Sequence, residues 1–305
     1  MNLNFFNLFL TKTNFPDEAK KELIKLSNDL YTSEKGQQLD KFLDLFYNSD
    51  FDVNIIKNGI SDLAADLQQS IYTIWILFFV FAAESAKYEY GRMNIDESIY
   101  WDTFSDIRYK AIECKKRYGV YGIFVPDWYP RFYRLNIFKF GCMQYDIDKY
   151  VDVEKKPYVY NNTVVQKDDF ILGIHIPSSG ESFNSSARME SYKKAYDFFK
   201  AKLNNKIMVC GCHSWLLYPE YRNIFSSNSN IRSFVDEFDI TSTINQDYFE
   251  DSWRIFGNAV SDNLPEDTSL QRSFKKYCLS GGKYGIGCGV LLFDGEKILT
   301  KKEGN

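Results

Sequence analysis

The chain has 305 residues, and its 37 Lys and Arg nearly balance its 41 Asp and Glu, which leaves a net charge of −4. Because the two signs are dispersed along the chain, a nucleic-acid-binding surface is not expected. Apolar residues make up 45% of the sequence, with 26 Phe, 22 Tyr and 5 Trp, so the chain can bury a large core. Its length suits two domains, or one domain with a helical extension.

The six cysteines lie far apart or form a C-x-C within a strand-like run, which is not the spacing of a secreted disulfide framework. The first fifteen residues lack the basic start and the small-residue cleavage site of a signal peptide. We therefore expect free thiols and a cytoplasmic location. The longest apolar run, residues 71–83, is shorter than the roughly 18 residues that span a bilayer. It predicts a buried core helix and no membrane segment.

Helical patterns dominate up to about residue 133. Pro16 opens a helix that carries apolar residues along one face to Leu30. Further helices are expected over residues 39–47, 55–67 and 68–90, the last apolar all round in its first half, as in the central member of a bundle. Asn94 with Glu97 suggests the cap of one more amphipathic helix that ends at Gly119.

Strand-like patterns follow from residue 135 onward. Residues 135–147 and 158–165 are rich in aromatic and branched side chains, and each run is expected to be β-structure. Toward the C-terminus we expect short helices near 218–225 and 248–256, a mixed stretch over 231–245, a helix capped by Thr268, and a final strand over 286–293. The chain is therefore expected to be an α+β protein with a helical domain over 1–130 and a sheet domain over 131–305.

Residues 169–214 read as a β-α-β unit. Apolar runs at 169–176 and 207–212 predict two buried strands, covered on both sides, and residues 187–203 predict a helix capped by Ser185 or Ser186. Such a unit normally forms a parallel pair of strands, and ligands bind off their carboxyl ends. The only two histidines, His175 and His213, fall at those ends, and the polar loop between the first strand and the helix ends at a helix N-terminus, which favours anions.

Each candidate residue has a functional and a structural interpretation. His175 is a candidate general base or a hydrogen-bonded histidine that fixes the strand end, and the same alternatives hold for His213. Glu181 is a candidate base that acts through a water, or a carboxylate stabilised near a helix N-terminus. Cys212 beside His213 suggests an acyl-thiol site, but neighbouring strand residues point to opposite faces. A metal site at Cys210, Cys212 and His213 lacks a second ligand pair at zinc spacing.

Several segments resemble a bacterial family with a helical acyltransferase-associated N-terminal domain and a GNAT-like C-terminal domain. They are ILGIHIPSSG (171–180), CHSWLL (212–217), SNIRSF (229–234), TSLQR (268–272), YWDTFSDIRYK (100–110) and FKFGCMQYD (138–146). The resemblance implies a mixed sheet in which two central parallel strands splay apart to hold acyl-CoA. It places Tyr218 as a candidate general acid, and these residues as candidate CoA contacts: Ile176, Ser178, Ser179, Gly180, Ser185, Ser186, Cys212 and Ser214.

The phosphate loop departs from the pattern of that fold. GNAT proteins use Q/R-x-x-G-x-G/A there, whereas this loop reads SSGESFNSS, with Gly180 as its one glycine followed by the acidic Glu181. The glycine-rich run at 280–289 precedes a strand rather than a helix, so it suggests a helix C-cap and the start of a hairpin more than a phosphate cradle.

The expected function is that of an acyl-CoA-dependent N-acyltransferase acting on a small amine or peptide, with acetyl-CoA or another acyl-CoA as co-substrate. The alternative is a noncatalytic ligand-binding or regulatory protein that keeps a GNAT-like cleft. Neither a nucleic acid nor a membrane is expected as a partner. The sequence leaves the acceptor, the acyl group and the oligomeric state open.

Overall fold

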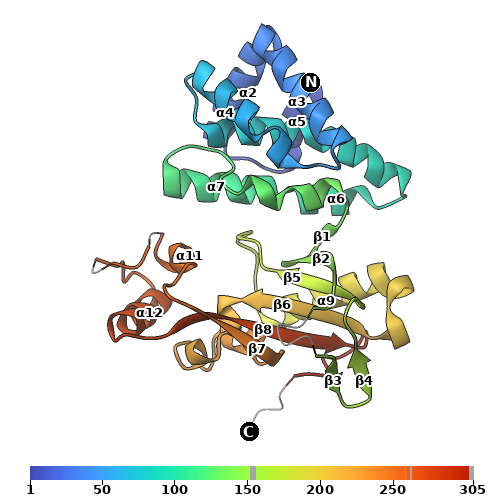
Figure 1. The fold of residues 1–305 in the computed structure, drawn as a ribbon, viewed down its shortest axis with the longest axis vertical. Helices are drawn as coiled ribbons and strands as arrows, with labels where there is room; N and C mark the ends of the chain where they lie inside the picture. The colour runs from blue at the N-terminus through green and yellow to red at the C-terminus, as the bar shows by residue number, and fades with distance from the viewer. Residues whose placement is uncertain (152–155, 258, 262, 302–305) are drawn as a thin grey trace. The chain divides into compact units, whose positions relative to one another are not determined.

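The computed structural model describes residues 1–151, 156–257, 259–261 and 263–301. The chain divides into two compact units. The helical unit comprises Met1–Lys139 and Pro177–Gly180, and the sheet unit comprises Phe140–Ile176 and Glu181–Asn305. Figure 1 labels elements of both units. A helical first half and a sheet in the second half confirm the predicted α+β class.

The helical unit contains eight α-helices among the described residues: α1 (Leu3–Lys12), α2 (Asp17–Tyr31), α3 (Glu34–Asn48), α4 (Lys57–Asp66), α5 (Ile71–Arg92), α6 (Glu97–Phe104), α7 (Asp106–Tyr118) and α8 (Pro130–Tyr133). The first of them, α1, was not predicted. Its N-cap is Asn2, whose side chain accepts from the amides of Asn4 and Phe5. The predicted end at Gly119 is confirmed, because this residue adopts a left-handed conformation with φ of 78°.

Helix α5 forms the centre of the helical unit. Every residue from Ile74 to Ala83 is buried, as expected for a helix that is apolar all round. By length and composition it is the one described helix that could cross a membrane, and 61% of its most apolar stretch is buried within the protein. The prediction of a buried core helix at residues 71–83 is confirmed.

Two predictions in this region are wrong. The single helix expected to run to Gly119 is two helices, α6 and α7, which meet at Ser105. The Ser105 hydroxyl donates to the carbonyl oxygen of Trp101 at 2.7 Å, a bond that bends helices. The cap of α6 is Asp96, which accepts from the Ser98 amide at 2.8 Å, whereas Asn94 lies before it with φ of 55°.

The main sheet has six strands in the order β1-β2-β5-β6-β8-β7. Their bounds are β1 (Ile137–Phe140), β2 (Met143–Lys149), β5 (Phe170–His175), β6 (Met208–Ser214), β8 (Tyr284–Phe293) and β7 (Asp239–Gln246). The prediction that β5 and β6 are adjacent and parallel is confirmed. The neighbouring pairs β2 with β5, β6 with β8, and β7 with β8 are antiparallel.

Two runs were predicted as β-structure, and each of them contains two strands. Gly141, with φ of 57°, separates β1 from β2. Residues 158–165 form the hairpin of β3 (Tyr158–Tyr160) and β4 (Thr163–Val165), which turns at Asn161, where φ is 51°. Asparagine tolerates this left-handed conformation, so the Asn-Asn dipeptide was a turn signal within the run.

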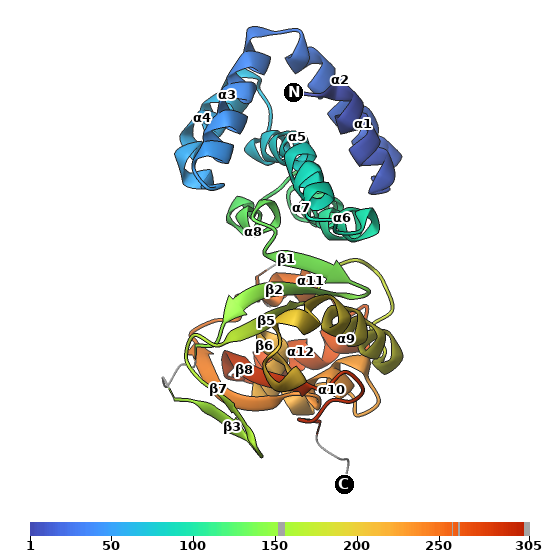
Figure 2. The same cartoon turned by 90° about the vertical axis from the view of Figure 1, so that its right-hand side faces the viewer.

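The sheet has two unlike faces. Helix α9 (Ser185–Phe199) covers one of them (Figure 2), where the Tyr145 hydroxyl lies 2.9 Å from that of Ser191 and Tyr192 packs on Phe293. We call this the helix face. The other face carries both histidines, and we call it the histidine face. Its part away from the histidines is covered by the β3–β4 hairpin around a cluster that includes Tyr158, Ile171 and Leu292.

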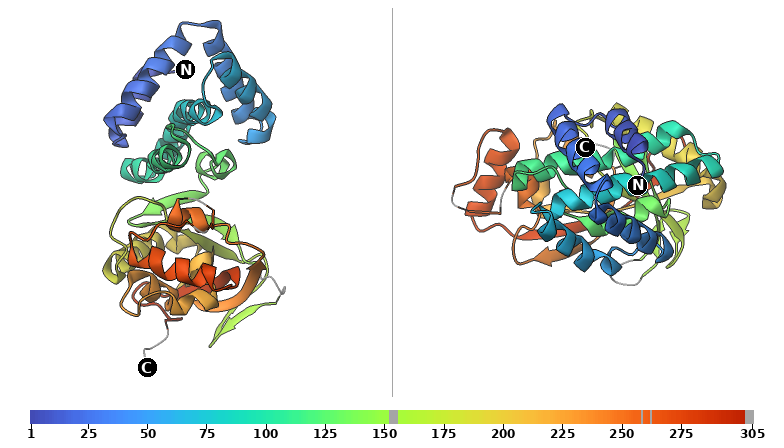
Figure 3. Two further views of the ribbon diagram at one scale, coloured as in Figure 1. Left: turned by 90° about the vertical axis from the view of Figure 1, so that its left-hand side faces the viewer. Right: turned by 90° about the horizontal axis from the view of Figure 1, so that it is seen from above.

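The described part of the sheet unit also contains the helices α10 (Asn230–Val235), α11 (Ser252–Phe256) and α12 (Ser269–Leu279), drawn in orange tones (Figure 3). Thr268 caps α12 as predicted, in a capping box with Gln271. The expected helix near 218–225 consists of two 3-10 segments, Trp215–Leu217 and Pro219–Asn223. Phe249, in the segment before α11, stacks on Phe274 of α12 with 5.6 Å between the ring centroids.

Alternate glycines of β8 let the chain after β6 lie flat on the helix face. A Cβ added at Gly287 would fall 2.1 Å from the backbone oxygen of Leu217, and one at Gly285 would fall 2.5 Å from the ring of Tyr218. This close approach explains the glycine-rich run that the sequence presents there. The C-cap part of the prediction also holds, since Gly281 follows α12 with φ of 76°.

Replacing Gly287 by Ala is expected to destabilise the sheet unit by about 1 to 3 kcal/mol, because the new methyl group meets backbone that cannot rotate away. Gly211→Ala is the matched control, since its Cβ would meet only the end of the Ile171 side chain, at 3.2 Å. Urea unfolding followed by circular dichroism measures both. Equal losses for the two variants would contradict the steric argument.

Candidate functional site

Strands β5 and β6 pair over a short distance and then part. Their parallel register holds only for Leu172 with Cys210 and Gly173 with Gly211. On its outer side β5 stays paired with β2 up to His175, and β6 stays paired with β8 up to Ser214. The outer partners therefore hold the two strand ends apart from each other, and the sheet opens at the carboxyl ends of its two central strands (Figure 1).

His175 and His213 lie on either side of this opening and on the same face of the sheet. Each stands two residues beyond the paired glycines Gly173 and Gly211, and residues two apart in a strand share a face. His175 has a side chain that is 35% exposed, and His213 is also exposed. The structure thus brings together the two histidines that the sequence placed at the strand ends. It also shows that the histidine face is partly exposed at these strand ends, so the predicted cover on both faces holds only for the part of each strand that lies under the β3–β4 hairpin.

Asp146 is the acidic neighbour of His175. Its Oδ2 lies 3.8 Å from Nε2 of His175, and its side chain is only 15% exposed. Asp146 pairs in register with Gly173, and a Cβ added at Gly173 would lie 3.6 Å from Nε2 of His175. The imidazole therefore packs over Gly173, toward the carboxylate of Asp146.

Cys288 of β8 is the neighbour of His213. The two residues are register partners, so their side chains share the histidine face. Their hydrogen bond raises the pKa of His213, with a smaller contribution from the Asp148 carboxylate, while partial burial and the nearby His175 act in the opposite direction. Cys288 itself is 3% exposed.

Cys212 lies on the helix face, as the alternation of strand residues predicts. It is 4% exposed, and burial raises the pKa of its thiol to about 12. Cys212 and His213 therefore do not form a nucleophile and base pair. All six cysteines are buried free thiols.

The loop after β5 divides between the two units. Ser178, Ser179 and Gly180 group with the helical unit, whereas Ile176 and Glu181 belong to the sheet unit. Gly180 has φ of 76°, a conformation that suits glycine, and Glu181 is exposed.

The N-cap of α9 corrects the prediction for this loop. The cap is Asn184, whose Oδ1 accepts from the Ala187 amide at 2.9 Å, so Ser185 and Ser186 are exposed residues of the first turn. Asparagine is as good an N-cap as serine, and nothing local decides among adjacent polar residues.

Ser214 and Tyr218 have local partners. The Ser214 hydroxyl accepts from the Leu216 amide at 3.2 Å and caps the 3-10 turn after β6. Tyr218 is 4% exposed, and its hydroxyl donates to Oδ1 of Asn245 at 2.9 Å. Because Tyr218 packs on Gly285, it lies on the helix face, away from the histidines.

The start of α9 is anchored by a buried ion pair. Arg188 is fully buried, and its Nη2 donates to Oε1 of Glu237 at 2.7 Å while Nε contacts both carboxylate oxygens. Its remaining donors reach the carbonyl oxygens of Phe183 and Asn230 and the Ser233 hydroxyl. The network connects the loop, α9 and α10.

Sequence reasoning missed Asp146, Cys288 and the two paired glycines. The available signal was a glycine inside each of two apolar strands. Such a glycine often marks a place where a ligand or another segment of backbone approaches the strand closely. Asp146 and Cys288 carried no such signal. Their proximity to the histidines depends on the strand register alone.

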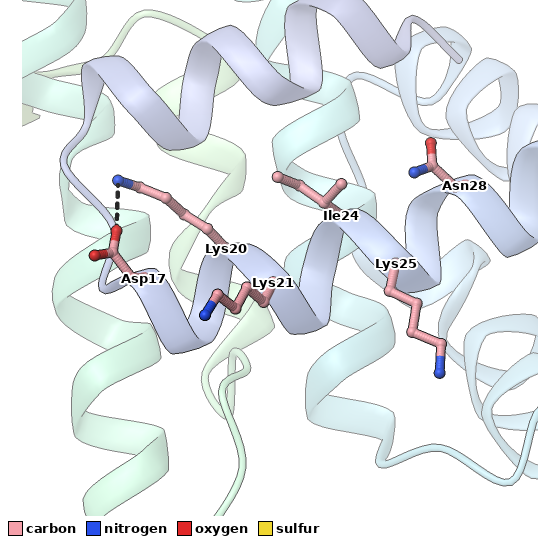
Figure 4. A pocket seen from close by; sticks show the side chains of 6 residues that line it. All are labelled: Asp17, Lys20, Lys21, Ile24, Lys25 and Asn28. Carbon is pink, nitrogen blue, oxygen red and sulfur yellow. Dashed lines mark hydrogen bonds and ion pairs between the residues drawn. The ribbon is translucent and has the colours of Figure 1, made fainter.

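A surface hollow of the helical unit is formed by a single helix. A hollow of about 660 Å³ lies along α2 of the helical unit, lined by Asp17, Lys20, Lys21, Ile24, Lys25 and Asn28 (Figure 4). All six residues come from one helix, and an ion pair of 3.4 Å joins Lys20 to Asp17. Within the described part of the chain, no group of three His, Cys, Asp or Glu side chains is placed to hold a metal ion.

Comparison with known proteins identifies both halves of the chain. Residues 4–135 match the family described as N-acyltransferase N-terminal domain, and residues 137–291 match the GNAT-like C-terminal domain. No curated protein sequence matches the chain.

Two solved structures are similar over most of the chain. One is an acyltransferase mutant in complex with octanoyl-CoA, with 16% identity and a TM-score of 0.71. The other is an acyltransferase in complex with decanoyl-CoA and teicoplanin, with 17% identity and a TM-score of 0.70. In each case 92% of this chain and 85% of the other are covered, and at such identities the likeness shows the fold. The chain belongs to the family that joins an N-acyltransferase N-terminal domain to a GNAT-like C-terminal domain.

Proposed function

We propose that the protein is an acyl-CoA-dependent N-acyltransferase whose acceptor is a small amine or a peptide. The observation that carries the proposal is the parting of β5 and β6 after Gly173 and Gly211, with a histidine on each side. Membership of the family and the acyl-CoA complexes of its structural neighbours support the same assignment.

His175 is the proposed general base. A neutral imidazole can take a proton from an amine at physiological pH. Asp146, 3.8 Å away, orients the ring and stabilises the imidazolium that forms. Glu181 is the second candidate base, acting through a water. Backbone amides at the strand end would stabilise the oxyanion that develops on the thioester carbonyl.

The proposed CoA contacts come from two parts of the chain. In the sheet unit they are the first turn of α9 at Ser185 and Ser186 and the strand ends at Ile176, Cys212 and Ser214, and in the loop after β5 they are Ser178, Ser179 and Gly180. The amides of a helix N-terminus favour phosphate groups. Of these residues Cys212 can contribute only through its backbone, since its side chain lies buried on the helix face.

A panel of ligands tests the proposal. Thermal shift with CoA, acetyl-CoA, octanoyl-CoA and decanoyl-CoA is expected to raise the melting temperature, because a ligand that binds only the native state stabilises it. Release of free thiol is then measured with primary amines and short peptides as acceptors. Turnover with any pair of acyl-CoA and acceptor would support the acyltransferase function.

The rival function is noncatalytic ligand binding. The observation that favours it is the phosphate loop, which has one glycine and the exposed Glu181, a charge that repels phosphate. Stabilisation by CoA thioesters without thiol release across the acceptor panel would support the binder. Absence of any stabilisation by CoA compounds would contradict the acyltransferase, and occupancy of the cleft by an unrelated ligand would support the binder.

A further inference from the structure

We propose that His213 is the general acid of the transfer reaction, protonating the sulfur of the departing CoA, and that Cys288 is the residue that positions it. This inference rests on the acyl transfer proposed above. It assigns the base to His175 on β5 and the acid to His213 on β6.

The two histidines share one face but have unlike partners. His175 lies beside the carboxylate of Asp146, whereas His213 is hydrogen-bonded to the thiol of its register partner Cys288. Base and acid in one site need environments that separate their protonation states. The reaction has one atom that loses a proton, the amine nitrogen, and one that gains a proton, the thioester sulfur. One histidine on each side of the opening provides a separate partner for each of these atoms.

The surroundings of His213 favour its protonated form. The hydrogen bond with Cys288 on β8 raises the pKa of His213 above the ordinary value, and Asp148 on β2 acts in the same direction. Partial burial and His175 on β5 oppose them but do not reverse the shift. His213 therefore keeps its proton to a higher pH than a free imidazole does.

Cys288 acts through His213 and not on the substrate. It lies in the middle of β8 with 3% of its surface exposed, so an acyl carbonyl cannot approach its sulfur closely. The tyrosine that follows β6, Tyr218, donates its hydroxyl to Asn245 on the other face of the sheet. His213 is thus a proton donor on the same face as His175.

The proposed step balances without any further reactant. The amine nitrogen attacks the thioester carbonyl carbon, so that a C–N bond forms and the C–S bond breaks. His175 takes one proton from the nitrogen, and His213 gives one proton to the sulfur of CoA. The products are the amide and free CoA, and proton exchange with water returns both histidines to their starting states.

A change of leaving group tests the acid. With acyl-CoA, His213→Ala is expected to lower kcat/KM by ~100-fold, the size of a lost general acid. With an acyl ester of an aromatic thiol, which leaves as a stable thiolate, the same variant should lose less than about tenfold. His175→Ala should lower both rates alike. An equal loss for both thioesters in His213→Ala would overturn the assignment, whereas an inactive wild-type protein would instead count against acyl transfer itself.

Nuclear magnetic resonance tests the role of Cys288 without any substrate. The chain has two histidines, so two imidazole signals are expected, and the His175→Ala and His213→Ala variants assign them. Cys288→Ala should lower the pKa of His213, and Cys288→Ser, which keeps a hydrogen-bonding group, should lower it less. Cys210→Ala is the matched control, because it removes a buried thiol from the helix face of β6. An unchanged His213 titration in Cys288→Ala would refute the positioning role.

Discussion

Replacing Arg188 by Met is expected to destabilise the sheet unit by about 3 to 5 kcal/mol, the usual loss when one partner of a buried ion pair is removed. The variant would leave Glu237, which is 1% exposed, with the Tyr192 hydroxyl at 2.8 Å as its remaining side-chain donor. A buried carboxylate without its cation is costly because water can no longer solvate it. Chemical unfolding of the wild-type protein and the variant measures the difference.

A surface pair nearby provides the control. Arg222 bonds Asp236 at 2.8 Å, but its side chain is 45% exposed, so Arg222→Met should change stability by about 1 kcal/mol or less. The double variant Arg188→Met, Glu237→Met should recover part of the loss, since it removes both charges. If Arg188→Met costs no more than Arg222→Met, the pair does not anchor α9.

His175→Ala is expected to lower acyl transfer by ~100-fold or more while the free energy of unfolding changes by less than about 1 kcal/mol. The large effect on rate follows from losing the group that deprotonates the amine. The small effect on stability follows from a side chain that is 35% exposed. Turnover with the best acceptor and urea unfolding of the same variant give the two values.

Chemical rescue separates the two interpretations of this histidine. Added imidazole should restore part of the activity of His175→Ala, because it supplies the missing base to the space left beside Asp146. A structural histidine predicts the reverse pattern. Stability would then fall by about 1 to 3 kcal/mol through unpaired buried partners, and activity per folded molecule would stay the same.

Local patterns were sufficient for the elements whose cause is local. The apolar run of α5, the capping box at Thr268 and the glycine that ends α7 each depend on residues within a few positions, and each prediction holds. The parallel pairing of β5 with β6 was also predictable, because a crossover of this length with one helix joins neighbouring parallel strands. Both histidines could therefore be placed at one end of the sheet.

Where local signals compete, the sequence was ambiguous. The cap of α9 falls among adjacent polar residues, and the hairpin at Asn161 lies inside one aromatic and branched run. The helix break at Ser105 depends on a hydroxyl that bonds the preceding turn. In each case several local arrangements have similar free energies, and packing of the whole unit selects one.

The chemistry of the site depends on register, which is a property of the folded sheet. Cys288 is 75 positions after His213 in the sequence, and Asp146 is 29 before His175, yet each lies beside its histidine. A shift of one residue in either pairing would move the partner to the helix face. Cross-strand neighbours have no periodic signal that marks them in a single sequence, so only the packed sheet shows which side chain sits next to each imidazole.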